Sequence, residues 1–233
     1  MTLKPAIGII GGLGPQASAL LYKRIVEKTK DHTNLNDTAD YPRVVLISTS
    51  IPNYLSTGEA TDPEILAKVV GIVQEETRLL EEGGAIVNCI ACNTAHLALD
   101  QLRAVTTVPF LSIMDLMRDA AQGFKKPGIL STVLTKQMGL YSDVHPNLFV
   151  PKDDILVEAE TYIFKLLDDK ITSEDVAAFR RFVARYKADN GLDAVLLACT
   201  ELPVIYGSVS DASIVSTLDV LADGLLDYYF AHL

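Results

Sequence analysis

The chain has 233 residues, of which 49% are hydrophobic and 21% are charged, as is typical of a globular protein with one large or two small packed domains. Its 30 acidic and 20 basic side chains give a formal net charge of −10 at pH 7. This charge argues against nonspecific binding to nucleic acid or to an anionic membrane surface, so neither is an expected partner.

The apolar runs and the cysteines bear on where the protein works. The longest apolar runs have the length of strands, so no transmembrane helix is expected. Residues 1–5 carry a single lysine and lead into no hydrophobic segment with a cleavage site, so no signal peptide is expected either. The three cysteines lack the spacing of a disulfide framework, which predicts free thiols in a reducing cytoplasm.

Strand-like and helix-like segments alternate along the whole chain. Short β-prone apolar runs indicate buried strands, and longer runs with apolar residues at helical spacing indicate helices. In chain order, the expected strands cover 6–10, 43–50, 86–91, 108–113 (a short strand or connection), 127–130 and 195–198, and the expected helices cover 16–30, 63–82, 94–103, 114–123, 155–167, 173–189 and 218–233. Such alternation predicts an α/β fold with parallel sheets.

Two cysteines occupy matching places in the two halves. Cys92 and Cys199 each follow an apolar strand, precede a helical pattern, and are 107 residues apart (199 − 92). The Lys-Pro pairs before the strands at 6–10 and 127–130 also match, with 122 residues between Pro5 and Pro127 (127 − 5). These near-repeats predict an internal duplication in which each half supplies one cysteine to a shared cleft.

Polar and glycine-rich segments follow the predicted strands. In open parallel sheets, ligands bind beyond the carboxyl ends of the strands, so these segments are the expected binding region. They are Gly11–Pro15, Ser48–Ser50, Cys92–Thr94, Ser131–Thr132 and Cys199–Glu201. The loop over 51–62, which contains Pro52 and Gly58, is long enough to indicate a lid or another functional role.

A pair of thiols at these positions suits proton transfer. Amides at a helix start can lower the pKa of a thiol enough to populate a thiolate base, and a protonated thiol opposite it can act as an acid. Two such groups on opposite faces of one carbon can invert a stereocentre without a cofactor. The alternative is that Cys92 and Cys199 are ordinary buried cysteines, because free cysteine is among the most buried residue types.

Three other patterns are weaker. Cys89 and Cys92 form a C-x-x-C, but residues three apart on a strand point to opposite faces, which argues against a redox pair or a metal site with His96 and Cys199. Gly12 to Ala17 fits the dinucleotide fingerprint G-x-G-x-x-A, but the next strand ends in Ser48-Thr49-Ser50 rather than in an acid. The preferred interpretation is a tight turn whose amide N–H groups bind a carboxylate.

Several polar residues have two open interpretations. Arg43 begins its strand and is either a surface arginine or a ligand for an acidic group. His96 follows Cys92 by four residues, so it either supports the thiol or caps the local helix. Glu201 follows Cys199 by two residues and either orients a thiol or a substrate amine, or interacts with the helix start.

Four stretches together resemble the aspartate/glutamate (Asp/Glu/hydantoin) racemase superfamily, in its aspartate racemase branch. They are Gly11-Gly12-Leu13-Gly14-Pro15, Pro42-Arg43, Cys92-Asn93-Thr94-Ala95-His96 and Cys199-Thr200-Glu201-Leu202-Pro203. The resemblance implies two similar α/β domains with pseudo-twofold symmetry and an active site in the cleft between them. The first domain would contain 1–103 plus 211–233 and supply Cys92, and the second would contain 104–210 and supply Cys199.

The resemblance also implies an activity and a set of binding residues. It implies cofactor-independent racemisation, without metal, of aspartate or glutamate by Cys92 and Cys199, in a homodimer. It implies that Asn93, Thr94 and Thr200 hold the α-carboxylate and that Arg43 helps to bind the acidic side chain. The full set of expected substrate-binding residues is Gly12, Arg43, Ser50, Asn93, Thr94, Thr132, Thr200 and Glu201, with His96 in support.

The sequence departs from the family pattern at two places. Leu13 stands where methionine is common, and neither Lys165 nor Lys170 is clearly in register with the lysine that aspartate-specific relatives carry about thirty residues before the second cysteine. A different or broader substrate range is therefore open. Other cysteine-dependent members of the superfamily, namely hydantoin racemases, maleate isomerases and decarboxylases, are alternatives, as is a binding protein on the same fold without turnover.

Overall fold

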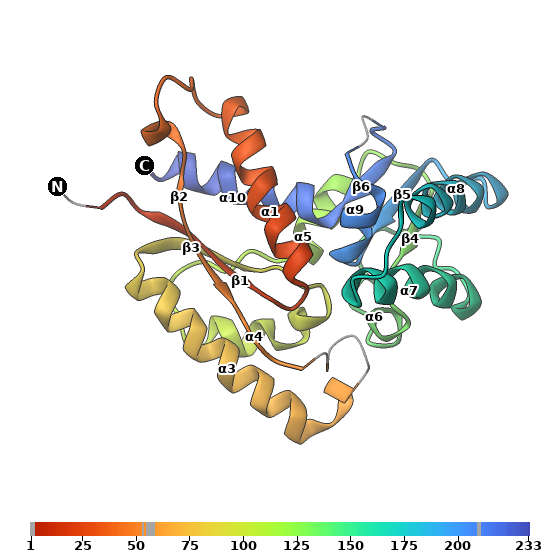
Figure 1. Cartoon of the computed structure of the whole chain (residues 1–233), viewed down its shortest axis with the longest axis horizontal. Helices are drawn as coiled ribbons and strands as arrows, with labels where there is room; N and C mark the ends of the chain where they lie inside the picture. Colours follow the sequence, from red (N-terminus) through yellow and green to blue (C-terminus); the bar gives the residue numbers. More distant parts are fainter. Residues whose placement is uncertain (1–2, 53, 55–58, 209–210) are drawn as a thin grey trace. The chain divides into compact units, whose positions relative to one another are not determined.

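The computed structural model describes residues 3–52, 54, 59–208 and 211–233. The chain divides into two compact units, Met1–Ser112 with Leu221–Leu233 and Ile113–Val220. Each unit is built around a parallel sheet of three strands flanked by helices, so the predicted α/β class with parallel sheets is confirmed (Figure 1).

The sheet of unit 1 has the strand order β2-β1-β3. The strands are β1 (Ala6–Gly11), β2 (Arg43–Ser48) and β3 (Ala85–Ile90), and the helices are α1 (Pro15–Lys28), α3 (Pro63–Glu82), α4 (Leu99–Arg103) and the second part of α10 (Thr217–Ala231). Short 3-10 helices cover Thr29–Asp31, Thr38–Asp40, Glu59–Thr61 and Thr94–Ala98.

Alternation along β1 directs successive side chains to the two faces of this sheet. Ile10 packs into a core cluster with Val69, Val73 and Leu80 of α3, while α1 covers the other face (Figure 1). Helix α3 begins where predicted because the Asp62 carboxylate accepts the amide of Glu64 at 2.8 Å, which satisfies a free N–H of the first turn.

The end of the chain packs onto unit 1. The Tyr229 hydroxyl of α10 donates to the carbonyl of Pro5 at 3.2 Å, and Asp223 pairs with Lys28 of α1 at 2.9 Å. Helix α10 is apolar along most of its length, and its buried leucines contribute to the core.

The sheet of unit 2 has the strand order β4-β5-β6. The strands are β4 (Pro127–Leu130), β5 (Ala194–Leu197) and β6 (Ile214–Ser216), and the helices are α5 (Ile113–Ala121), α6 (Val133–Gln137), α7 (Asp153–Leu167), α8 (Ser173–Asp189) and α9 (Glu201–Tyr206). Its core cluster is aromatic in part, with Phe179 and Phe182 of α8 packed at a centroid distance of 6.0 Å.

The two sheets repeat the same arrangement when two isolated bridges are included. Phe110 pairs in parallel with Asn88 of β3, and Phe149 pairs in parallel with Gly128 of β4. Unit 1 then has the order β2-β1-β3-Phe110, and unit 2 has the order Phe149-β4-β5-β6. Strand β4 therefore corresponds to β1, and β5 corresponds to β3, as an internal duplication requires.

A pair of equivalent hydrogen bonds fixes the register of this repeat. The amide of Ala91 donates to Ile10 O at 2.8 Å, and the amide of Ala198 donates to Leu130 O at 2.8 Å. The first strands are thus offset by 120 residues (130 − 10), whereas the matching of Pro5 with Pro127 assumed 122. The Lys-Pro pairs are therefore out of register by two residues.

Some predicted elements differ from the structure. Of the segment 108–113, Phe110 alone forms a bridge, and α5 already begins at Ile113. The short elements α6, α9 and β6 were not expected. Part of the long loop, at 53 and 55–58, lies outside the described residues, so its interpretation as a lid stays a prediction. No helix in the described ranges is both long and apolar enough to cross a membrane.

Candidate active site

The two cysteines occupy equivalent positions in the two units. Cys92 lies two residues beyond β3 and Cys199 lies two residues beyond β5, and each side chain is 7% exposed. A turn of helix starts two residues after each sulfur, at Thr94 in unit 1 and at Glu201 in unit 2. Both thiols are therefore placed at the carboxyl end of a central strand, where open parallel sheets bind their ligands.

Cys199 contacts a carboxylate. Its Sγ lies 3.0 Å from Glu201 Oε2, and the hydroxyl of Thr200 donates to the same oxygen at 3.1 Å. Glu201 is 5% exposed, and its Oε1 has no hydrogen-bond partner among the described residues. Burial raises the pKa of Glu201, while the bonds from Cys199 and Thr200 act in the opposite direction.

Cys92 has a different neighbourhood. His96 is buried, and its Nδ1 lies 2.8 Å from the carbonyl oxygen of Cys92, so Nδ1 carries the hydrogen that the carbonyl accepts. The ring thus binds the main chain at the cysteine, and the interpretation that it supports the thiol stays a prediction. Thr94 stands at the place that Glu201 occupies in unit 2, so no carboxylate follows Cys92 at that position.

Cys89 belongs to the core of unit 1. It is 0% exposed within β3, and burial raises the pKa of its thiol, which leaves it protonated and inert. None of the three cysteines forms a disulfide bond. The described ranges contain no group of three or more His, Cys, Asp or Glu side chains arranged to hold a metal ion.

The residues expected to hold the α-carboxylate are buried beside the cysteines. Asn93 and Thr94 are 2% and 6% exposed at the start of the 3-10 helix after β3, and Thr200 is 1% exposed at the start of α9. The structure thus brings Asn93 and Thr94 together with Cys92, and Thr200 together with Cys199.

Thr132 acts within its own helix. Its hydroxyl accepts the amide of Thr135 at 3.1 Å and donates to Thr135 Oγ1 at 2.9 Å, so it caps α6. By the offset of 120, Thr132 corresponds to Gly12 in unit 1. Its expected contact with a substrate therefore competes with this capping role.

Gly12 is required for close packing. Its φ of +78° is unfavourable for other residues, and a Cβ there would lie 2.4 Å from the main-chain N and O of Thr49. Its amide donates to Ser18 Oγ at 2.9 Å. The amide is therefore engaged within the turn, and the expectation that it binds a substrate carboxylate stays a prediction.

Ser50 and Arg43 lie at different ends of β2. Ser50 is exposed just beyond the carboxyl end of the strand, next to the buried Thr49. Arg43 pairs with Ala6 at the amino end, about 16 Å along the strand from Ser48. Its guanidinium donates to the carbonyl of Gly83. The structure thus places Arg43 at the opposite end of β2 from Ser50, where it joins β2 to the turn after α3, and its predicted role in binding an acidic side chain stays a prediction.

Both lysines considered for side-chain recognition are engaged within unit 2. Lys165 pairs with Asp175 at 2.5 Å, and Lys170 pairs with Asp168 at 2.8 Å. Both side chains are exposed. Exposed pairs of this kind contribute little to stability and indicate no binding role.

Several polar residues around the strand ends were missed from the sequence. Ser18 closes the glycine turn, since its hydroxyl accepts from Gly12 and donates to Gly14 O at 3.0 Å. Glu160 of α7 accepts the amide of Val133 at 2.8 Å, which satisfies the start of α6. The spacing of Thr132 and Thr135 could have indicated a helix cap. The contact of Glu160 with Val133 spans 27 residues, so no local sequence pattern indicates it.

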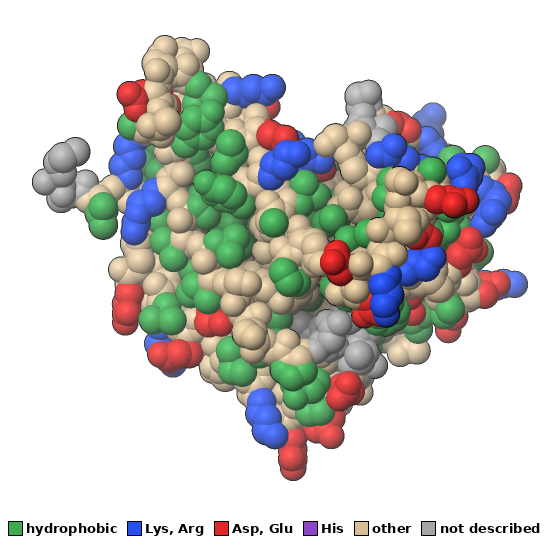
Figure 2. Space-filling model, viewed as in Figure 1, with side chains coloured by type: hydrophobic (Ala, Val, Ile, Leu, Met, Phe, Trp, Pro, Cys, Tyr) green, Lys and Arg blue, Asp and Glu red, His purple; other side chains and the backbone are tan. Residues whose placement is uncertain are grey.

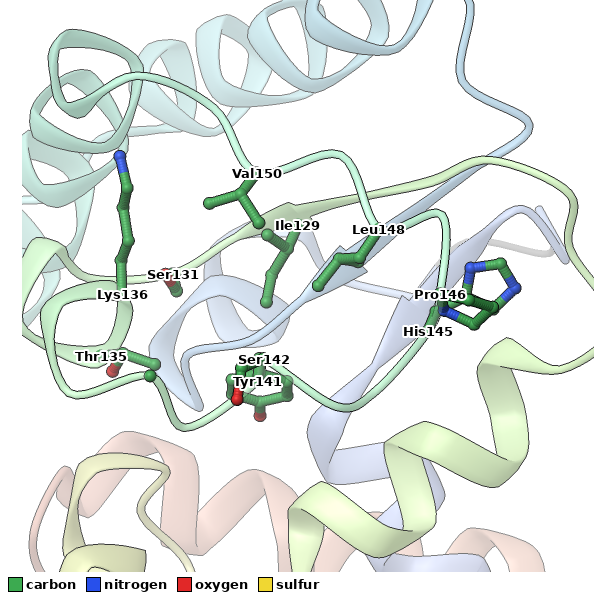
Figure 3. Close-up of a pocket in the computed structure, with 11 residues that line it drawn as sticks. Ile129, Ser131, Thr135, Lys136, Tyr141, Ser142, His145, Pro146, Leu148 and Val150 are labelled. Atoms are coloured by element: carbon green, nitrogen blue, oxygen red, sulfur yellow. The ribbon is translucent and has the colours of Figure 1, made fainter.

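Unit 2 also contains a cavity of about 390 Å³ near the end of β4. Ile129, Leu148 and Val150 gather on one side of it and Tyr141 and Ser142 on the other, while the amine of Lys136 turns away (Figure 3). That amine is held by Pro151 O at 2.8 Å and by Asp153 at 2.6 Å. The cavity lies on the face of the sheet that α1 covers in unit 1, where the corresponding α6 has only 5 residues.

Comparison with known proteins finds similarity to amino-acid racemases and their homologues. The chain is 22% identical over 231 residues to the broad specificity amino-acid racemase RacX of Bacillus subtilis, covering 97% of this chain and 99% of the relative. Its structure resembles an aspartate racemase homologue of Pyrococcus horikoshii, with a TM-score of 0.75 and 25% identity, over 96% of this chain and 98% of that one. It also resembles the aspartate racemase of Picrophilus torridus, with a TM-score of 0.72 and 26% identity, over 97% and 94% of the two chains.

A family model extends this similarity over most of the sequence. The model for Asp/Glu/hydantoin racemase matches residues 10–223, a range that includes both strand-end cysteines and the segments around them. The resemblance to this family and to its aspartate racemase branch is thereby confirmed. The chain belongs to the Asp/Glu/hydantoin racemase family, a family of isomerases.

Proposed function

We propose that this protein racemises amino acids without a cofactor by moving protons between Cys92 and Cys199, with aspartate and glutamate as the first candidate substrates. The observation that carries the proposal is the equivalent placement of the two thiols, each two residues beyond a central strand of its own unit and each 7% exposed. The two domains predicted from the sequence, 1–103 plus 211–233 and 104–210, would supply Cys92 and Cys199 respectively.

The proposed reaction needs one thiolate and one thiol. The thiolate removes the α-proton, so the Cα–H bond breaks and its electron pair remains on the α-carbon. The thiol on the opposite face then donates its proton to that carbon, which inverts it. The first cysteine ends as a thiol and the second as a thiolate, so protons and charge balance without an oxidant or a reductant.

The α-carboxylate would be held by Asn93, Thr94 and Thr200. These three side chains are buried next to the two sulfurs, where amide and hydroxyl groups can replace the water around a carboxylate. They would fix the α-carbon between the thiols, and positioning of this kind accounts for a large part of enzymatic rate acceleration.

The range of side chains that the site accepts is a separate question. The names of the family and of two similar structures point to aspartate and glutamate, and the name of the Bacillus subtilis relative points to a broader range. Arg43, the cation first expected to recognise an acidic side chain, lies at the amino end of its strand and donates to the carbonyl of Gly83, so recognition of acidic side chains needs a direct test. We therefore propose testing acidic and neutral amino acids side by side.

The test is chiral chromatography after incubation of the pure protein with each enantiomer of aspartate, glutamate, alanine, serine and lysine. No pyridoxal phosphate or metal is added, and EDTA is present. We expect at least one amino acid to approach a 1:1 mixture from either side. Failure to convert any of them would contradict the proposed activity, and conversion of neutral substrates alone would contradict the acidic range.

We also propose that the protein forms a homodimer, as the family resemblance implies. Strand β2 lies at the edge of its sheet and exposes Leu46, while Tyr22 and Leu35 are also exposed. Figure 2 shows apolar side chains gathered over the region of β2 and α1. Sedimentation velocity should give the mass of two chains, and a single-chain mass at micromolar concentration would contradict this proposal. The cytoplasmic location stays a prediction.

A further inference from the structure

The two cysteines differ in the charge that stands beside them. Position 94 in unit 1 corresponds to position 201 in unit 2 (94 + 107), and it is threonine in the first unit and glutamate in the second. The carboxylate of Glu201 lies 3.0 Å from Cys199 Sγ, and both residues are almost fully buried. An otherwise repeated site is therefore electrostatically asymmetric.

The contact between Cys199 and Glu201 favours one distribution of protons. The pair can hold its proton on sulfur, next to a carboxylate, or on the carboxyl group, next to a thiolate. The ordinary pKa of a carboxyl group lies about four units below that of a thiol, which favours the proton on sulfur. Burial raises the pKa of Glu201 and so opposes this preference, whereas the hydrogen bonds from the Cys199 thiol and from the Thr200 hydroxyl, which donates to Glu201 Oε2 at 3.1 Å, stabilise the ionised carboxylate.

Other titratable groups on the elements around Cys199 have their own contacts. On α7, Glu160 accepts the Val133 amide at 2.8 Å, and on α8 the Tyr186 hydroxyl donates to Ile129 O at 3.1 Å. Tyr162 of α7 and Tyr206 of α9 pack against Phe179 in the aromatic cluster. The cation on these elements that bonds α9 is Arg180 of α8, which donates to Tyr206 O at 2.8 Å, at the opposite end of α9 from Glu201.

The groups around Cys92 are different. His96 bonds the carbonyl of Cys92, and Glu76 of α3 accepts a hydrogen bond from the hydroxyl of Thr49. Tyr54 packs against the core cluster of unit 1 that includes Cys92, and Cys89 is fully buried. Thr94 stands where the glutamate stands in unit 2, so the residue two positions after Cys92 carries no carboxylate to oppose a thiolate.

We propose that Glu201 is a positioning residue that keeps Cys199 protonated in the free enzyme, so that Cys199 is the proton donor and Cys92 is the proton acceptor. The inference rests on the proposed function and adds the assignment of acid and base to it. In the turnover that starts from this form, Cys92 takes the α-proton and Cys199 delivers its own. Glu201 accepts the hydrogen bond that orients the Cys199 S–H and does not itself bind the substrate.

The test is the pH dependence of alkylation by iodoacetamide on the full chain, quantified at each cysteine by peptide mass spectrometry. The thiolate is the reacting form, so the midpoint pH reports the ionisation of each thiol. Cys92 and Cys199 have equal exposure, which makes them a matched pair, and unmodified Cys89 verifies that the protein stays folded. We expect the midpoint of Cys92 to lie at least one pH unit below that of Cys199.

A variant then tests the cause. Glu201→Gln should lower the midpoint of Cys199 by at least one unit, a tenfold gain in thiolate, and leave that of Cys92 unchanged. Glu160→Gln, the same substitution at a carboxylate that bonds an amide, should move neither midpoint. A Cys199 midpoint at or below that of Cys92 in the natural protein would overturn the proposal, and so would an unchanged Cys199 midpoint in a folded Glu201→Gln variant.

This experiment is independent of turnover. If the thiols ionise in the expected order but no amino acid is racemised, the proposed function is wrong and the role of Glu201 stands. If racemisation occurs and the order is reversed, the assignment of acid and base is wrong and the racemase proposal stands.

Discussion

Units 1 and 2 share one plan and differ at the points where function needs a difference. In both units the sheet consists of three strands and one bridged residue. In both, the amide of the residue before the cysteine donates a 2.8 Å hydrogen bond to the carbonyl at the end of the neighbouring strand. Yet the first unit follows its cysteine with Asn93 and Thr94, and the second follows it with Thr200 and Glu201. The comparison teaches that the backbone of the site is conserved between the units while its charge is not.

The units also differ in how they cover one face of the sheet. Helix α1 has 14 residues, whereas its counterpart α6 has 5, and the cavity near Ile129 occupies the space left in unit 2. In unit 1, the lack of a side chain at Gly12 lets the main chain of Thr49, just beyond β2, approach closely. At the equivalent position of unit 2, Thr132 caps α6. Each unit therefore stabilises the segment after its first strand by different means.

The largest expected effect concerns the matched thiols. Cys92→Ala and Cys199→Ala should each lower kcat by about 10²–10⁴-fold or more, because each removes one of the two proton-transferring groups. Cys89→Ala is the control, since Cys89 is fully buried within β3, and it should retain kcat within about twofold. The measurement is chiral chromatography of initial rates. Full activity in either of the first two variants would contradict the equivalence of the two units.

The turn after the first strand provides the next test. Gly12→Ala should lower the free energy of unfolding by about 2–5 kcal/mol, because it combines a positive φ with overlap against the main chain of Thr49. Gly139→Ala also has a positive φ, of +65°, but nothing lies within 4 Å of the added Cβ, so about 1–2 kcal/mol is expected. Urea denaturation measures both, and equal losses would show that close packing at Gly12 is unimportant.

A buried polar residue distinguishes the central strands. Asn88 is 0% exposed, and neither polar atom of its side chain has a partner among the described residues, whereas the equivalent residue of β5 is Val195. Asn88→Val should raise the free energy of unfolding by about 1–2 kcal/mol, because it removes an unsatisfied amide. The reverse exchange, Val195→Asn, should lower it by about 2–4 kcal/mol. Destabilisation by Asn88→Val in urea denaturation would mean that the amide has a partner such as ordered water.

The smallest expected effect lies at the helix that covers unit 2. Thr172 caps α8 through the amide of Asp175 at 3.1 Å, so Thr172→Ala should cost about 1 kcal/mol, and Ser173→Ala much less. Lys165 and then Thr172 lower the pKa of Asp175 to about 2. Because this pKa is depressed, the ionised Asp175 carboxylate contributes fully to the stability of the folded protein above about pH 4, and this contribution disappears as the pH falls through about 2. The Thr172 hydroxyl donates to the Asp175 carboxylate as well as accepting its amide, so the difference in melting temperature between Thr172→Ala and the natural protein should shrink at low pH, and a difference that grows down to pH 2 would contradict this account.

Much of the fold followed from periodicity and punctuation. Helix α3 has the predicted bounds because Asp62 and Pro63 begin it and Gly83 ends it, and α8 also has its predicted bounds. Strand β6, with 3 residues, and α9, which contains Pro203, were missed because segments so short carry no period. The two-residue error in the repeat arose because identical Lys-Pro pairs were aligned, whereas hydrogen bonding sets the register.

The site was predictable where neighbours in sequence are neighbours in space. Contacts among the consecutive residues Cys199, Thr200 and Glu201 could be anticipated. The sequence did not indicate that the thiol and the hydroxyl would share one oxygen of Glu201. Arg43 begins β2, so its place at the far end of the strand from Ser50 could be anticipated, while its ligand role rested on the family resemblance and stays a prediction. Contacts such as Glu160 with Val133 depend on tertiary packing that no local pattern encodes.

The central claim is that two cysteines act on opposite faces of one carbon, and early-time deuterium labelling tests it most directly. A single enantiomer of an accepted amino acid is incubated with the protein in D2O, and both enantiomers are isolated below 5% conversion and analysed by mass spectrometry. The two-base account predicts that the product carries deuterium at the α-carbon while the remaining substrate retains protium. A product that retains the substrate's own α-hydrogen would show that one base acts on both faces, and would contradict the account.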